Sequence, residues 1–152
     1  YQSPHSFSTH VVAVQVSREN GMVEILNYTA IHDCGRILNP MLVEGQVHGG
    51  IAQGIGQALW EGMAYSPDGQ PLTASLMDYA LPRAAHIPDL IMENIDTPSP
   101  TNPLGSKGVG SVSTVPSPVA VANAVLDALS SAGVRHIDTP LTPEKIWRAL
   151  RG

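Results

Sequence analysis

The alternation of apolar and polar residues at the start of the chain predicts a β-hairpin. Residues 10–17, "HVVAVQVS", follow the two-residue period of a half-buried strand. The next four residues, "RENG", contain Asn20-Gly21, a strong signal for a tight hairpin turn. Residues 22–33, "MVEILNYTAIHD", then resume as a second strand. The first thirty-odd residues are therefore expected to fold back on themselves as a two-stranded unit.

The pattern next changes to that of a helix. Asn39 is a good N-cap residue and Pro40 suits the first helical position, so a helix is predicted over residues 40–61. Within it stand five glycines: Gly45, Gly49, Gly50, Gly54 and Gly56. Each glycine in a helix interior lowers stability by roughly 0.5–1 kcal/mol relative to alanine. Such a helix is expected only where something must approach its backbone closely.

The rest of the chain is predicted to hold shorter elements. In order, these are a turn at 66–70, a short helix at 75–81 before Pro82, a strand at 90–96, a Pro-, Gly- and Ser-rich region at 97–118, a helix at 119–132 ended by Gly133, and a last short helix opened by Thr142-Pro143. Because the strands are grouped early and the helices are interspersed, the fold class is predicted to be α+β.

Composition narrows the classes of function. Of the 152 residues, 43% are hydrophobic, enough for a core, and only 14% are charged, which indicates that much of the surface is covered by something else. The net charge of −5 and the lack of a basic run argue against nucleic acid or an anionic membrane as a partner. A single cysteine, Cys34, excludes an internal disulfide and a zinc or iron–sulfur site built from this chain's cysteines. No apolar run approaches the about 18 residues of a membrane span.

One face of the predicted long helix carries carboxamides. At about 100° per residue, Gln46, Gln53 and Gln57 lie within about 40° of each other, with Gly50 on the same face and Gly49 close to it. The opposite flank suits a core, with Val47, Ile51, Ile55 and Ala58. Two interpretations stay open. The glutamines face water while the glycines let another helix pack closely, or the carboxamides line a cleft for a planar, polar ligand.

A glycine-rich loop, "GSKGVGSVST", occupies residues 105–114. Gly105, Gly108 and Gly110 surround Lys107, a pattern that fits an anionic group held by backbone amides. The loop matches neither the Walker A spacing nor the dinucleotide-binding fingerprint, and a tight surface loop is an equal alternative.

The run His32-Asp33-Cys34 at the end of a predicted strand is a weaker candidate. A metal site or a nucleophile would need partners at ligand spacing, and the six histidines are scattered without such a pattern. The favoured interpretation is a buried, polar strand end.

Several stretches together carry a resemblance to a known family. They are "HDCGRILNP" at 32–40, "EGQVHGGIAQGIGQAL" at 44–59, Asp78-Tyr79 with Leu81-Pro82, "GSKGVG" at 105–110, "AVANAV" at 120–125 and "TPEKIWRAL" at 142–150. In this order the chain resembles the C-terminal part of the molybdenum-binding large subunit of the xanthine dehydrogenase, aldehyde oxidase and carbon monoxide dehydrogenase family. The resemblance covers nearly the whole chain.

The resemblance implies a molybdopterin cofactor, in bacteria often its cytosine dinucleotide, buried between domains of the large subunit. Gln46 is implied to contact the pterin and metal region, and residues 107–110 to wrap around the cofactor. The implied cofactor-binding residues are Gln46, Gly49, Gly50, Gln53, Ser106, Lys107, Gly108, Val109 and Gly110. No residue of this chain is expected to bind the metal directly.

The implied reaction is oxidative hydroxylation of an aldehyde, an N-heterocycle or a related small substrate. Electrons would leave through 2Fe-2S clusters, usually toward FAD, on other domains or subunits. In the family, the general base is a glutamate directly after the glycine run, and here that position is Ser111. A serine hydroxyl cannot take a proton without a base of its own, so the loss of a factor of about 10²–10⁴ in rate is expected unless something compensates.

We interpret residues 1–152 as one C-terminal cofactor-binding domain, or a fragment of a larger subunit, because the chain opens at Tyr1 without an initiator methionine. Its expected partners are the rest of the large subunit, the iron–sulfur and FAD subunits and a small-molecule substrate. A cytoplasmic location is expected, with the periplasm as the alternative. On its own the chain is not expected to turn over substrate. The alternatives are a non-catalytic paralogue and a module that binds an anionic nucleotide without redox chemistry.

Overall fold

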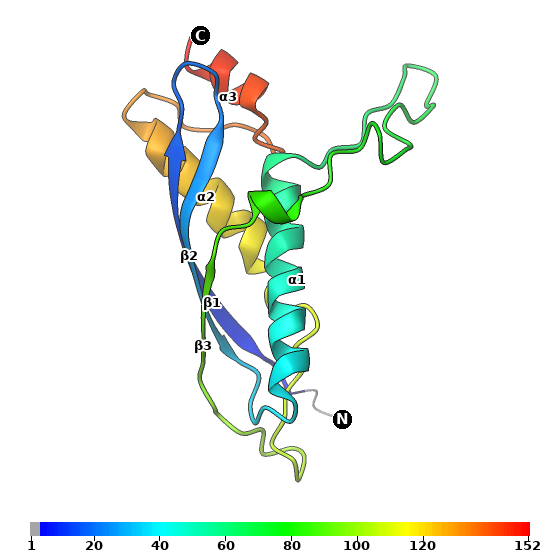
Figure 1. Cartoon of the computed structure of the whole chain (residues 1–152), viewed down its shortest axis with the longest axis vertical. Coiled ribbons are helices and arrows are strands. Elements are labelled where there is room, and N and C mark those ends of the chain that lie inside the picture. The colour runs from blue at the N-terminus through cyan, green and yellow to red at the C-terminus, as the bar shows by residue number, and fades with distance from the viewer. Residues whose placement is uncertain (1–3) are drawn as a thin grey trace.

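The computed structural model describes residues 4–152 and shows one three-stranded sheet with helices packed against it (Figure 1). Strand β1 (Phe7–Val16) pairs antiparallel with β2 (Val23–Asp33), and β3 (Leu90–Asn94) lies parallel on the other side of β2. The helices are α1 (Pro40–Leu59), α2 (Pro116–Ser130), α3 (Pro143–Ala149) and the 3-10 turn η1 (Ala84–His86). The predicted α+β class is confirmed.

The predicted hairpin is confirmed, and its turn explains the glycine. The side chain of Asn20 accepts a hydrogen bond from the Met22 amide at 3.0 Å, and Gly21 has a φ of +74°, which favours glycine. A Cβ at Gly21 would also lie 2.1 Å from the carbonyl oxygen of Pro143 at the start of α3. Gly21 is thus required both by the turn and by the close approach of α3.

The two longer helices begin and end close to the predicted positions. The Asn39 side chain caps α1 by accepting from the Leu42 amide at 3.2 Å, and the helix ends at Leu59 rather than 61. Helix α2 begins at Pro116, three residues before the predicted 119. The backbone N–H groups of the first helical turn have no partner inside the helix, so proline, which has no N–H, costs nothing there. The Pro-rich run can therefore continue directly into the helix.

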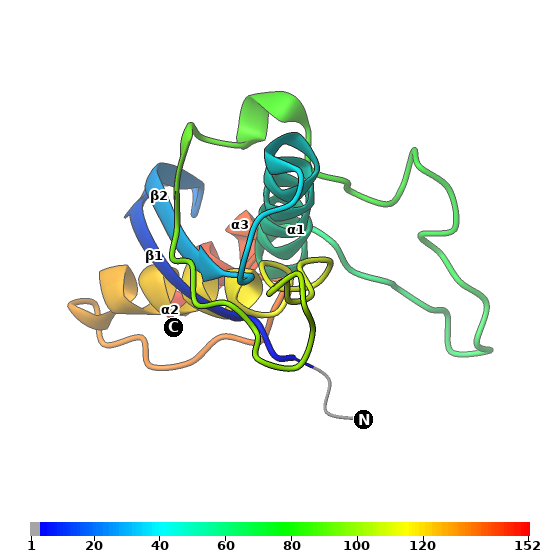
Figure 2. The same ribbon diagram turned by 90° about the horizontal axis from the view of Figure 1, so that it is seen from below.

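The predicted helix at 75–81 is wrong. The Ser75 carbonyl accepts from the amides of Asp78 and Tyr79, which closes a single turn, and no helix follows. Residues 62–82 extend away from the sheet and helices in both views (Figures 1 and 2). A short helix is marginal without a surface on which to bury its apolar face, so the segment stays extended. The predicted turn at 66–70 is confirmed, with the Gly69 amide on the Ser66 carbonyl at 2.9 Å.

The core lies between the sheet and the two longer helices (Figure 2). Tyr28 is fully buried, and its hydroxyl donates to Ser117 Oγ of α2 at 2.9 Å, which in turn donates to the Ile51 carbonyl of α1 at 3.1 Å. This chain of bonds ties β2 to both helices. The other fully buried or nearly buried apolar residues are Ala30, Val47, Ile51, Ile55, Ala58, Leu59, Val121, Val125, Leu129, Leu141 and Ile146. Within residues 4–152, no helix is long and apolar enough to cross a membrane.

The glycines of α1 divide into two groups. A Cβ at Gly54 would lie 2.4 Å from the Cβ of Ser117, and one at Gly50 would lie 2.9 Å from Thr114 Oγ1. These two glycines therefore allow the segment leading into α2 to pack directly on α1. Around Gly45 and Gly49, in contrast, a Cβ would meet nothing within 4 Å. Internal packing explains the first group and leaves the second unexplained.

The two groups predict opposite effects on stability. Gly54→Ala should lower the free energy of unfolding by about 1–3 kcal/mol, because the added methyl overlaps Ser117. Gly49→Ala, the matched control on the same helix, should raise it by about 0.5–1 kcal/mol, because it adds helix propensity without a clash. Urea unfolding followed by circular dichroism measures both. A loss of stability in both variants would contradict the division.

Candidate functional site

Two loops that are far apart in the sequence run side by side at one end of the molecule. The Lys107 amide donates to the Cys34 carbonyl at 2.8 Å, and the Arg36 amide donates to the Gly105 carbonyl at 3.0 Å. This pairs Gly35 with Ser106 as a short antiparallel bridge. Gly35 has a φ of +64°, and a Cβ there would lie 2.3 Å from the Gly105 carbonyl oxygen. The loop after β2 is therefore the support on which the glycine loop rests.

The ammonium group of Lys107 fixes this arrangement. Its Nζ lies 2.9 Å from Asp33 Oδ2 and 2.8 Å from Thr97 Oγ1, and the side chains of Lys107 and Asp33 are only 10% and 14% exposed. Thr97 Oγ1 also donates to the Asp33 carboxylate. Burial alone would raise the pKa of Asp33, but hydrogen bonds from Thr97, Lys107 and the Gly35 amide outweigh it and hold the pKa well below its ordinary range. Asp33 is therefore a fixed anion, and the charge of Lys107 is used inside the chain.

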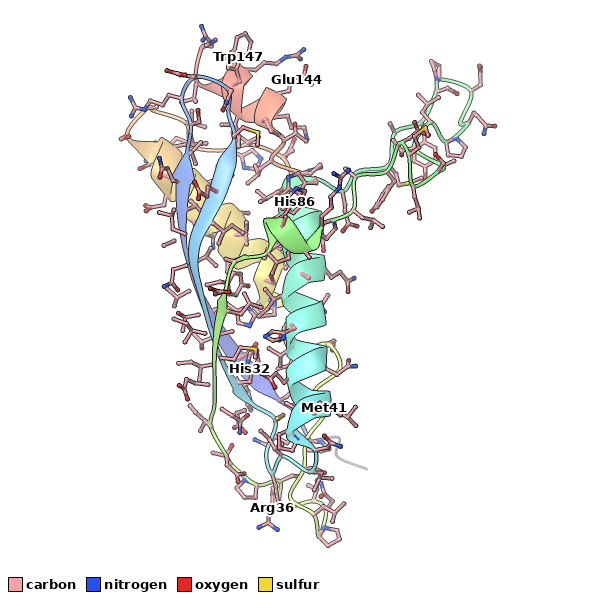
Figure 3. All side chains as sticks on the ribbon, in the orientation of Figure 1. His32, Arg36, Met41, His86, Glu144 and Trp147 are labelled. Carbon is pink, nitrogen blue, oxygen red and sulfur yellow. The ribbon has the colours of Figure 1, made fainter. Side chains whose placement is uncertain are left out.

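A groove of about 250 Å³ opens where the glycine loop meets the first turns of α1. Its lining comes from the loop after β2, from α1 and from the glycine loop: Cys34, Arg36, Leu38, Asn39, Leu42, Val43, Gln46, Ser106, Lys107 and Val109. Arg36 lies at the tip of the turn below α1, and Met41 lies at the start of that helix (Figure 3). The groove thus joins the carboxamide face to the glycine loop, the two features that the sequence singled out separately.

The predicted site residues do not all share this groove. Gln46, Ser106, Lys107 and Val109 line it. A Cβ at Gly110 would lie 3.9 Å from Gln46 Oε1, so Gly110 adjoins it. Gly49 and Gln53 are exposed further along α1, and Gly108 is exposed on the loop. Gly50 is buried, and Ser113 and Thr114 lie where its side chain would stand.

Ser111 lies at the exposed end of the glycine loop, on a backbone held from several sides. Its carbonyl accepts from the Val115 amide at 3.4 Å at the start of α2. The next carbonyl, that of Val112, accepts from Ser8 Oγ at 2.7 Å. Ser113 Oγ lies 2.9 Å from His32 Nε2, and both residues are buried. The position after the glycine run is therefore held by β1, β2 and α2 together.

The contact to His32 belongs to a buried polar chain. His32 Nε2 lies 3.3 Å from His10 Nε2, and His10 Nδ1 lies 2.8 Å from the Tyr28 hydroxyl. Burial lowers the pKa of both histidines, that of His10 to about 4 with a further contribution from His32. Burial raises the pKa of Tyr28 to about 12, against a lowering effect of the Ser117 hydrogen bond. At neutral pH all three side chains are uncharged, so the chain fixes the loop without introducing a buried charge.

Asp33 and Arg36 are the site residues that sequence reasoning missed. In the sequence, Asp33 stands out only as part of a possible metal site, and nothing there connects it with Lys107, 74 residues later. Arg36 stood inside the "HDCGR" stretch, where its charge beside a loop could have been noticed. Among residues 4–152, no cluster of three or more His, Cys, Asp or Glu side chains could hold a metal ion.

Comparison with known proteins assigns the family. The family model described as a molybdopterin cofactor-binding domain matches residues 2–88, more than half of the chain. This chain belongs to the molybdopterin cofactor-binding domain family. The family resemblance inferred from the ordered motifs is confirmed.

Several similar proteins extend the match to nearly the whole chain. The nicotine 6-hydroxylase large subunit of Paenarthrobacter nicotinovorans is 41% identical over 94% of this chain, which covers 18% of that protein. The crystal structure of quinoline 2-oxidoreductase from Pseudomonas putida 86 matches 93% of this chain and 18% of its own, at 41% identity and a TM-score of 0.90. A structure of Cu,Mo-CO dehydrogenase matches 98% of this chain and 19% of its own, at 33% identity and a TM-score of 0.92. The chain spans about a fifth of the length of the curated relatives it matches.

The Lys107–Asp33 pair predicts a strong effect of a nearly isosteric substitution. Asp33→Asn should lower the free energy of unfolding by about 3 kcal/mol at pH 7, because it leaves a mostly buried ammonium without its counter-ion. The contribution of Asp33 is complete above its ordinary pKa of about 3.9 and is lost as the pH falls below it. The difference between variant and unaltered protein should therefore shrink below about pH 4.

Urea unfolding at a series of pH values measures this difference. The control is Glu144→Gln, which breaks the Glu144–Arg148 pair of α3, whose side chains are 69% and 72% exposed. An exposed pair should contribute less than about 0.5 kcal/mol. Equal losses in the two variants would show that the site pair has no special role.

Proposed function

We propose that this chain forms part of the molybdopterin-binding surface in the large subunit of a molybdenum hydroxylase, with the cofactor in its cytosine dinucleotide form. The observation that carries the proposal is the groove, in which the Gln46 carboxamide of α1 faces the glycine loop. The relatives support it, because those named above are a hydroxylase subunit, an oxidoreductase and a CO dehydrogenase. The whole of residues 1–152 would serve as one cofactor-binding domain of that subunit.

The residues present fit a large, polar, partly flat group. Gly108 lies between the lining residues Lys107 and Val109, and Gly49 lies further along α1; at both glycines there is open space where a side chain would stand, so a ligand that extends beyond the groove can reach the backbone there. Gln46 supplies both a hydrogen-bond donor and an acceptor, and Arg36 supplies a cation at the rim. The loop backbone at Ser106 is held by Asn102 Nδ2, which donates to its carbonyl at 2.9 Å.

The pairing of Lys107 weakens the alternative of a module that grips an anionic nucleotide by a lysine. Its ammonium is committed to Asp33 and Thr97, as in a structural ion pair, and is only partly exposed. In our proposal Lys107 acts through the position it gives to the backbone of residues 107–110. Gln53, further along α1, would contact a more distant part of the same cofactor.

When bound, molybdopterin supplies a redox-active molybdenum centre at which a small substrate can be oxidised and hydroxylated. The residues of this chain would bind and orient it. Gln46 would hydrogen-bond its polar edge, the glycine loop would limit its movement, and the apolar groove residues Leu42 and Val43 would exclude water from one side. In our proposal 2Fe-2S clusters and FAD on other domains or subunits take up the electrons, and the enzyme is cytoplasmic.

Ser111 supports a second candidate, a non-catalytic paralogue that keeps the fold and the cofactor. Its hydroxyl can donate and accept hydrogen bonds, but it does not hold a proton near neutral pH as a carboxylate does. His32, which contacts Ser113 two residues further on, and His10 beside it are both uncharged because burial lowers their pKa values, so they suit support of the loop rather than proton uptake.

Cofactor retention tests the proposal. In the purified assembly that contains this chain, Gln46→Leu should weaken binding by about 1 kcal/mol, roughly fivefold, because it removes a hydrogen bond and keeps the size of the side chain. Molybdenum by mass spectrometry and pterin by fluorescence, before and after dialysis, measure the loss. Gln57→Leu, on the same helix but outside the groove, is the control and should retain the cofactor. An unaltered assembly without molybdenum would overturn the proposed function.

The base is tested separately by Ser111→Glu. If the chemistry lacks only this group, kcat/KM for aldehydes or N-heterocycles should rise by about 10²–10⁴ in the assembled enzyme. The control is Ser111→Gln, because glutamine is nearly the same size as glutamate but has no titrating carboxylate. It should give no such rise. High activity of the unaltered enzyme would exclude the non-catalytic paralogue and show that the proton is taken elsewhere.

A further inference from the structure

A long projection leaves the body of the molecule between α1 and η1. Residues 62–82, here called the arm, run outward from the end of α1, turn at Ser66–Gln70 and return to η1 (Figures 1 and 2). The two views at right angles agree that the arm does not fold back over the sheet or the helices. None of its residues belongs to the core.

The arm carries large apolar side chains into solvent. Met77 is 94% exposed and Leu76 is 79% exposed, and the others that are about half exposed are Met63, Tyr65, Leu72 and Leu81. Scattered exposed apolar residues are ordinary, but six on one projection of 21 residues form a concentrated surface. A surface of this kind is typical of a contact with another protein surface.

The arm is built to point outward. At its base, the Tyr79 hydroxyl donates to Glu61 Oε2 at 2.7 Å, and Pro82 packs where Gly56 leaves room. The two runs beside the Ser66–Gln70 turn are joined by several hydrogen bonds, such as that from the Leu72 amide to the Ala64 carbonyl at 2.7 Å. The turn that carries Leu76 and Met77 is held only by local bonds to Ser75, whose carbonyl accepts from the Asp78 and Tyr79 amides. A two-stranded hairpin without a further layer is marginally stable in water. A firm base with a locally bonded apolar turn indicates that this turn is completed by contact with something else.

The charges of the arm disfavour a second copy of this chain as that partner. Between residues 62 and 82 the only charged side chains are Asp68 and Asp78, and the chain as a whole has a net charge of −5. Two copies would bring surfaces of the same sign together. The fitting partner is an apolar groove with a neutral or basic rim.

The comparison with CO dehydrogenase points to where that groove lies. A match over 98% of this chain leaves about three of its 152 residues outside, fewer than the 21 of the arm. Most of the arm therefore has a counterpart in the CO dehydrogenase chain. That chain is much longer, because this one covers only 19% of it. We propose that the arm docks into an apolar groove on the remaining part of the molybdopterin-binding subunit, with Leu76 and Met77 as its central contacts. This inference rests on the proposed function, since it takes the chain to be part of such a subunit.

Photo-crosslinking in the complete assembly tests the docking. p-Benzoylphenylalanine in place of Met77 should crosslink to peptides of the molybdopterin-binding subunit outside these 152 residues, severalfold more than the same probe in place of the exposed His136. Crosslinks to a second copy of this chain, to an iron–sulfur or flavin subunit, or to nothing would overturn the proposal.

Hydrogen exchange gives an independent measurement that does not depend on the probe. The amides of residues 74–78 should be protected in the assembly, and Met77→Glu should speed their exchange about tenfold by opening the contact. Gln70→Glu adds the same charge to the arm without removing an apolar contact and should leave the exchange unchanged. Full exposure of these amides in the unaltered assembly would contradict docking. Molybdenum content measured on the same samples tests the proposed function separately. A docked arm in an assembly without molybdenum would refute the molybdopterin-binding function and leave the docking intact.

Discussion

The ion pair between Lys107 and Asp33 is the constraint on which the candidate site depends. It joins the last residue of β2 to the middle of a loop 74 residues later, and Thr97 closes the group from a third segment. Because both side chains are mostly buried, removing one charge would leave the other without water or a counter-ion. The two residues must therefore stay together for the loop to fold. The backbone bridge between Gly35 and Ser106 then follows, and this bridge places the glycine loop beside the first turns of α1. A lysine whose place among glycines suits an external anion is thus the residue that gives the loop its shape.

Around this pair the site is made almost entirely of neutral groups. The carboxamide of Gln46 and the open backbone at Gly49 and Gly108 can hold a polar group without opposing its charge, and the histidines behind the loop, which support it, are uncharged. Arg36 at the rim is the exception. Such a surface can accommodate changes of charge on a bound redox group with little rearrangement, because few protein charges must respond.

The sequence predicted the local elements well, because the signals that define them are local. Asn20-Gly21, Asn39-Pro40 and Thr142-Pro143 each fix a turn or a helix start through bonds to neighbours two or three residues away. The helix expected at 75–81 failed because no surface packs against it, which only the tertiary structure shows. The partner of Lys107 could not be predicted for the same reason, since loop pairing over 74 residues leaves no periodic trace. The family resemblance pointed to Gln46 and the glycine loop, whereas the groove between them forms only when the chain folds.

The two groups of glycines in α1 should differ in how readily related sequences replace them by larger residues. Gly50 and Gly54 are held by the chain's own packing, so any descendant that keeps this fold must keep them small, whatever it binds. Gly45 and Gly49 face open space, so only contact with something outside this chain could restrain them. A lineage that loses its ligand would accumulate larger residues at the second pair first while the first pair stays fixed. The helix therefore carries a record of whether its outer face is still in use.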